Sequence, residues 1–239
     1  MTAKDLLIKS AHHFLQLYSN LMTMPCRLCG ASCQHQPLCN DCIAELPILT
    51  SACPRCAIPM TFPQLCGHCL TNPPEQQLSF SLFTYQEPID RLIIDLKFHE
   101  KLYLSQFFAT KMAQQLKSRP LPELLIPIPL HPNRLRQRGY NQSLELAKAL
   151  SKQLNIPISN DYLSRIIDTQ SQSSIPFKQR KKNIQHAFKL DQSQVPTHIA
   201  LIDDVLTTGH TANEAAKLFR HAGTTMIEVW TIARTIRHH

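Results

Sequence analysis

Cysteine spacing constrains this 239-residue chain more than any other feature of its sequence. Eight of its nine cysteines form four CxxC pairs, and the sequence around them repeats, since "QPLCNDC" returns as "PQLCGHC". Each cysteine of the last two pairs follows its counterpart by the same interval: Cys26 and Cys53, Cys29 and Cys56, Cys39 and Cys66, Cys42 and Cys69. A fixed period of this kind indicates that a small unit has been duplicated.

Two CxxC turns can bring four thiolates to one ion, which completes a closed site of the structural zinc type. Units this small bury too little apolar surface to fold alone, so bound metal would supply their folding energy. A redox dithiol or disulfide staples are the alternatives, but the even repetition and the lack of an export signal favour zinc in a reducing compartment. We expect consecutive pairs to share an ion, although an interleaved cross-brace has the same spacing. The predicted zinc ligands are Cys26, Cys29, Cys39, Cys42, Cys53, Cys56, Cys66 and Cys69.

Charge and hydropathy narrow the class of protein. The formal net charge is +8, but two tetrathiolate zinc sites would lower it to about +4, so basicity alone is weak evidence for a phosphate-bearing partner. No apolar run approaches the roughly 20 residues of a membrane span. The cysteines without an export signal favour a reducing compartment, so a cytoplasmic location is expected. Residues 1–24 carry an apolar stripe that predicts an amphipathic helix packed on its own protein, with a membrane-surface helix as the alternative.

From Gln77 onward, strand and helix patterns alternate, which predicts an α/β fold with a doubly wound parallel sheet. The expected domains are therefore a helix over 1–24, a double zinc ribbon over 25–72 and the α/β domain over 77–236. Asn141 is suited to cap a helix that runs to about Leu154. The remaining expected strands cover 78–85, 124–130, 198–204 and 225–233, and the remaining helices begin at Pro88 and cover 103–116 and 210–221.

The stretch "LIDDVLTTGHT", residues 201–211, joins two requirements that one ligand can satisfy. A buried parallel strand would end here, at the sheet edge where ligands of open α/β folds bind. The glycine turn and the following helix N-terminus would cradle a phosphate, while the two carboxylates would face a sugar or a hydrated Mg²⁺. A ribose 5-phosphate fits both halves better than the alternative of a plain solvated strand end. The predicted ligand residues are Asp203, Asp204, Thr207, Thr208, Gly209, His210 and Thr211.

This stretch resembles the signature of the type I phosphoribosyltransferases, which bind phosphoribosyl pyrophosphate (PRPP) with Mg²⁺. Three further blocks, "IPIPLHPNRLRQRGYNQSLELA", "QSSIPFKQRKKNIQHAF" and "LKFHE", together with the paired CxxC motifs, resemble the ComF family. The resemblance implies a type I phosphoribosyltransferase fold behind a zinc-ribbon region. It also implies a role in natural transformation, meaning the handling of incoming single-stranded DNA. His210 departs from the pattern, which has a small residue at this position.

Transfer from PRPP would pass through an oxocarbenium-like sugar, so cations must hold the departing pyrophosphate. Lys97 and Arg138 are the candidates for this role beside the two aspartates, with Arg134 and Arg180 as further pyrophosphate or loop contacts; a solvated basic turn is the alternative. Two functions stay open. The chain is either a PRPP-binding protein of transformation, with single-stranded DNA and competence proteins such as a helicase as partners, or an active transferase on an unidentified acceptor. A PRPP-sensing regulator is a weaker third possibility.

Overall fold

The computed structural model describes residues 23–34, 36–168 and 186–236, in two compact units, Met1–Leu46 and Pro47–His239. The helix expected over 1–24 lies outside the described residues except for its last two, which belong to a strand. In the smaller unit, β1 (Thr23–Pro25) pairs antiparallel with β2 (Ser32–Gln34), and helix α2 (Asn40–Ala44) follows. In the described part of the chain, no helix is long and apolar enough to cross a membrane.

The larger unit is built on a four-stranded sheet in which every strand is parallel to its neighbours, as the sequence predicts. The strand order is β3 (Leu78–Thr84), β8 (Met226–Arg234), β7 (His198–Leu206) and β4 (Leu124–Pro127). The two central strands are almost completely buried, because helices cover both faces of the sheet.

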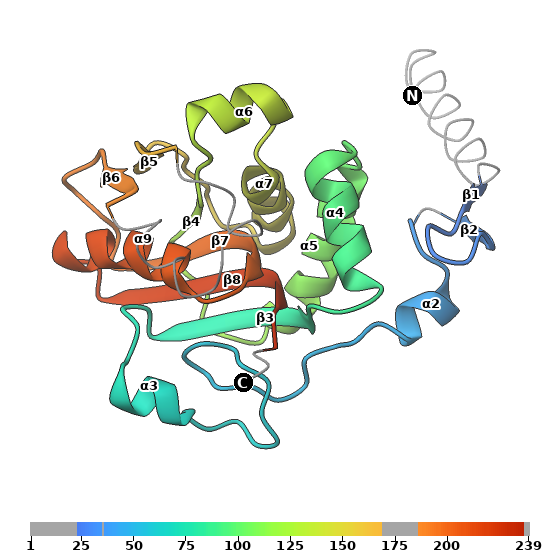
Figure 1. Ribbon diagram of the computed structural model, residues 1–239, viewed down its shortest axis with the longest axis horizontal. Helices are drawn as coiled ribbons and strands as arrows, with labels where there is room; N and C mark the ends of the chain where they lie inside the picture. Colours follow the sequence, from blue (N-terminus) through green and yellow to red (C-terminus); the bar gives the residue numbers. More distant parts are fainter. Residues whose placement is uncertain (1–22, 35, 169–185, 237–239) are drawn as a thin grey trace, which may run out of the picture. The chain divides into compact units, whose positions relative to one another are not determined.

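The helices divide between the two faces (Figure 1). Helix α9 (His210–His221) packs its alanines and Phe219 against alternate residues of the central strands, such as Leu201 and Val229. Three helices belong to the other side, where the second and third of them pack together: α4 (Ile89–Phe98), α5 (Tyr103–Leu116) and α7 (Gln142–Leu154). Asn141 caps α7 as expected, since its side-chain oxygen accepts a hydrogen bond from the Ser143 N–H.

Several short elements were not among the expected ones. The basic stretch after Pro132 is a helix, α6 (Pro132–Arg138), that ends at Gly139 in the left-handed conformation. Helix α3 (Gly67–Thr71) starts directly after Cys66. An antiparallel pair of strands, β5 (Leu163–Arg165) and β6 (Phe188–Leu190), flanks residues 169–185, which lie outside the described ranges.

The second set of four cysteines belongs to the larger unit, where it is fastened to β3. The Ser79 N–H donates a hydrogen bond to the Pro54 carbonyl at 2.8 Å, and the Ser79 hydroxyl donates to the Arg55 carbonyl at 2.7 Å. The first set, from Cys26 to Cys42, belongs to the smaller unit. The two copies of the repeat therefore have different structural surroundings.

Candidate functional site

Each consecutive set of four cysteines converges on one point, and within each set the four sulfur atoms lie within 4.8 Å of one another. Closest sulfur pairs are 3.6 Å apart for Cys29 and Cys39 and 3.7 Å apart for Cys56 and Cys66. Four thiolates around a tetrahedral zinc at about 2.3 Å would be roughly 3.8 Å apart, so both sets fit this metal. All nine cysteines are described, and they form no disulfide.

Backbone donors support the thiolate form that a metal ligand needs. Burial alone would raise the pKa of Cys26, but backbone N–H groups, including that of Cys39, hold this pKa down at about 5. The equivalent Cys53 accepts the Cys66 N–H at 3.4 Å, and its pKa is lowered to about 7 against the same opposing effect of burial. The two clusters thus repeat one hydrogen-bonding scheme, and each could hold a structural zinc ion.

The second candidate centre is the carboxyl edge of the sheet, where β7 brings two aspartates against the end of α4. Asp204 is 4% exposed, and its Oδ2 lies 2.9 Å from the Lys97 Nζ. Burial alone would lower the pKa of Lys97, but the Asp204 carboxylate raises it above its ordinary value. Lys97 is therefore a charged ammonium that neutralises Asp204.

The negative charge of Asp203 is less completely neutralised than that of Asp204. Its Oδ1 accepts hydrogen bonds from the Ser143 hydroxyl and from the Asp204 N–H, each at 2.9 Å. It keeps partial solvent access, yet burial and the neighbouring Asp204 raise its pKa to about 7, although Lys97 opposes the shift. An additional cation or a set of hydroxyl donors at this position would relieve that shift.

The segment between α6 and α7 supplies a cationic side to this edge. The Arg138 guanidinium donates a hydrogen bond to the Gln142 Oε1 at 2.6 Å and lies over the Phe98 ring, 4.8 Å from its centroid. The Tyr140 hydroxyl donates to the Leu96 carbonyl near the end of α4, so this segment is anchored beside Lys97. Burial lowers the pKa of Arg138, and the nearby Asp204 and Asp203 oppose this shift.

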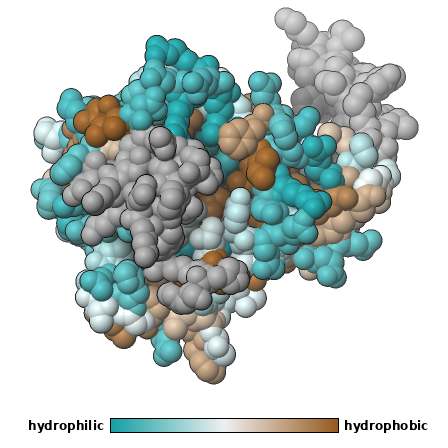
Figure 2. Space-filling model, viewed as in Figure 1, coloured by the Kyte–Doolittle hydropathy of each residue, from teal (hydrophilic) through white to brown (hydrophobic). Residues whose placement is uncertain are grey.

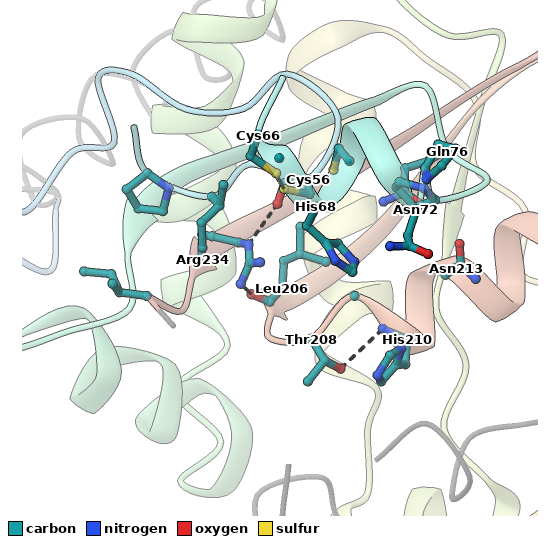
Figure 3. A pocket seen from close by; sticks show the side chains of 18 residues that line it. Cys56, Cys66, His68, Asn72, Gln76, Leu206, Thr208, His210, Asn213 and Arg234 are labelled. Atoms are coloured by element: carbon teal, nitrogen blue, oxygen red, sulfur yellow. Dashed lines mark hydrogen bonds between the residues drawn. The ribbon is translucent and has the colours of Figure 1, made fainter. Parts of the chain in front are cut away.

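The turn from β7 into α9 contains the predicted phosphate cradle, 207–211. Gly209 has φ +79°, in the left-handed region that favours glycine, and it is the residue before the first turn of α9. The His210 N–H donates to the Thr208 hydroxyl at 3.4 Å. A pocket of about 880 Å³ lies against this turn, and Figure 3 shows His210 and Asn213 on one side of it and His68 with two cysteines of the second cluster on the other.

The structure brings Asp203, Asp204, Lys97 and Arg138 together at one edge of the sheet, beside the turn, while their roles stay predictions. Arg134 instead lies with its Nε 3.7 Å from the Asp168 carboxylate, and Arg180 is outside the described residues. Two contributors were missed by the sequence reasoning: Ser143 and Phe98. Only Ser143 had a local signal, because it follows the helix cap at Asn141.

Comparison with known proteins adds relatives along most of the chain. The chain is 31% identical to the "DNA utilization protein YhgH" of Salmonella typhi over 227 residues, which cover 90% of this chain and 100% of that protein. It is 33% identical to "Competence protein F" of Haemophilus influenzae over 218 residues, 87% of this chain and 90% of the relative. "Competence protein ComFC" of Streptococcus pneumoniae is 27% identical over 157 residues, 64% of this chain and 67% of the relative. No protein-family model matches the sequence.

Proposed function

Because the chain belongs to the ComF family, we propose that it binds PRPP with Mg²⁺ and acts in natural transformation, where it handles incoming single-stranded DNA. The observation that carries the PRPP part is the incompletely neutralised Asp203 near the end of β7, which continues through the glycine turn into α9. Vicinal ribose hydroxyls would donate to the carboxylates, and the turn with the α9 N-terminus would receive the 5-phosphate.

Asp203 is the residue best placed to accept Mg²⁺. Both of its hydrogen bonds use Oδ1, so within the described ranges Oδ2 accepts none. Hard cations of this kind take carboxylate oxygens as ligands, and a pKa near 7 is what a carboxylate without enough counter-charge has. When bound, Mg²⁺ would add positive charge beside the pyrophosphate of PRPP.

Lys97 and Arg138 are the cations that would contact the pyrophosphate. Lys97 would keep its ion pair with Asp204 and present its remaining N–H donors to the pyrophosphate, since an ammonium carries three. Arg138 would offer its planar fork to the same anion, and Phe98 holds that guanidinium from the other side.

A titration with PRPP by calorimetry tests this proposal. Wild-type protein should bind PRPP with Mg²⁺, and Asp204→Asn should weaken binding by about 1 to 3 kcal/mol, because it removes the partner of Lys97 and one carboxylate acceptor. The matched control is Asp191→Asn, since Asp191 is also ion-paired, with its Oδ1 3.1 Å from the Lys189 Nζ, but directly after β6. Equal affinities for wild type and Asp204→Asn would contradict the proposal.

A role with DNA is supported by the names of the relatives, which refer to DNA utilization and competence. The single-stranded form is proposed from the surface near the edge. Helix α6 carries Arg134, Arg136 and Arg138, and Figure 2 shows hydrophilic side chains over this part of the molecule. Phe98 is 60% exposed beside them and offers a face on which a base can stack. We expect competence proteins, such as a helicase of DNA uptake, as partners.

An active transferase is the second candidate function, and the specific observation in its favour is that Lys97 and Arg138 meet the carboxylates at one edge. Two cations beside the predicted pyrophosphate position are what stabilisation of a leaving group requires. Release of pyrophosphate from PRPP that depends on an added base or other acceptor would establish this function. PRPP binding without such release, over a panel of bases, would favour the binding role.

A further inference from the structure

The second cysteine cluster and the signature turn, residues 207–211, form opposite walls of one pocket in the larger unit. Cys56, Cys66 and His68 lie on one side, and Thr208 and His210 lie on the other (Figure 3). The first cluster belongs to the other unit, Met1–Leu46. One side chain connects these two walls.

Arg234, the last residue of β8, spans the distance between them. It is 2% exposed, and its Nε donates a hydrogen bond to the Cys56 carbonyl at 2.8 Å. Its Nη1 donates to the Leu206 carbonyl at 2.9 Å and also to the Thr207 carbonyl. One guanidinium thus joins the backbone of a predicted metal ligand to the two residues with which β7 ends and the turn begins.

The geometry of the guanidinium makes this connection rigid. Its donors lie in a fixed plane, so the positions of the three carbonyls are set relative to one another. The Cys56 and Thr207 carbonyls would lose their hydrogen bonds from Arg234 if it moved, whereas the Leu206 carbonyl would keep the one from the Thr235 N–H. If Cys56 shifts, the Arg234 guanidinium must therefore move with it, or the hydrogen bond between Arg234 and the Cys56 carbonyl breaks.

A metal ion would determine where Cys56 lies. The first CxxC turn of the second cluster, residues 53–56, is called the knuckle below. Its carbonyls at Pro54, Arg55 and Cys56 accept hydrogen bonds from Ser79 and Arg234. The other half of the cluster, Cys66 and Cys69, would be joined to the knuckle by the zinc–sulfur bonds. Loss of the metal removes that cross-link, and the hydrogen bonds from Ser79 and Arg234 must then position the knuckle without it.

We propose that Arg234 is a positioning residue through which the metal-filled second cluster holds the signature turn in its ligand-binding form. This inference rests on the proposed PRPP function and gives the second cluster a role beyond its own fold, which is to support the ligand site. Because coupling between two sites is reciprocal, PRPP should also strengthen metal retention by the second cluster.

Hydrogen exchange of the zinc-loaded full chain, measured without PRPP, tests the coupling directly. Removal of zinc with a chelator should accelerate exchange in a peptide covering 205–212 by about fivefold or more. Arg234→Lys should show the faster exchange even with zinc bound, because a lysine ammonium cannot serve the three carbonyls in one plane. The matched control is Arg220→Lys: Arg220 also donates to three backbone carbonyls, those of Glu75, Thr224 and Thr225, and none of them belongs to the turn.

PRPP affinity provides the second readout. It should fall about tenfold in Arg234→Lys and stay within about twofold of wild type in Arg220→Lys. The inference would be overturned if hydrogen exchange in the turn of the wild-type protein were the same with and without zinc. It would also be overturned if a folded Arg234→Lys variant exchanged at the wild-type rate. If that variant does not fold, the wild-type zinc comparison decides. If wild-type protein binds no PRPP, the proposed function fails, but the exchange measurements still decide the coupling.

Discussion

Asp203→Asn should stabilise the unliganded protein while it weakens PRPP binding. The carboxylate is held among buried groups next to a second carboxylate, and its pKa of about 7 lies far above the ordinary 3.8. An asparagine oxygen can still accept the two hydrogen bonds from Ser143 and the Asp204 N–H, so the substitution removes a charge without removing these contacts.

The sign and size of the effect follow from the pKa shift. A carboxyl whose pKa is higher in the folded than in the unfolded protein destabilises the fold: the penalty is absent below about pH 4, grows as the pH rises to about 7 and is constant above. A shift of about three units corresponds to at most about 4 kcal/mol. Because Asp203 keeps partial solvent access and shares its charge with Asp204 and Lys97, we expect a gain of about 1 to 3 kcal/mol at pH 8.

Urea unfolding followed by tryptophan fluorescence measures this gain in the larger unit, because the single tryptophan, Trp230, is buried in β8. The difference between Asp203→Asn and wild type should increase from pH 6 to pH 7 and level off by pH 8, with zinc present throughout. Asp161→Asn, at an exposed carboxylate, is the control and should change the free energy of unfolding by less than about 0.5 kcal/mol. A variant that is no more stable than wild type at pH 8 would refute the reasoning.

Denatured protein should release about two zinc ions per chain into a chelating dye, and metal-free protein with four disulfides would contradict both metal sites. Cys26→Ser should remove one ion and leave the unfolding of the larger unit unchanged, whereas Cys53→Ser should lower its midpoint; the reverse order would contradict the role proposed for the second cluster. Single-stranded DNA binding should weaken with log salt at a slope near −3 if about four phosphates are neutralised. Replacing Arg180, Lys181 and Lys182 by alanine should flatten that slope by about 2, and an unchanged slope would exclude these residues from the interface.

Local signals in the sequence determined most of the elements. The helix expected over 103–116 is α5 with the same bounds, because the apolar period there is uninterrupted. The cap at Asn141 and the cysteine spacing were equally readable, since a cap and a CxxC turn each involve only a few neighbouring residues. Helix α6 was missed although Pro132 at its start and Gly139 at its end are typical helix boundaries.

Contacts between distant elements were decided only by the tertiary structure. Lys97, Ser143 and Arg234 come from α4, α7 and β8, and they meet residues 203–207 because the strand order places these elements at one edge of the sheet. That order depends on the burial of whole faces, which no short stretch encodes. The sequence also made the two cysteine repeats look equivalent, while packing assigns the second to the unit that carries the aspartates, because Ser79 and Arg234 bind its knuckle.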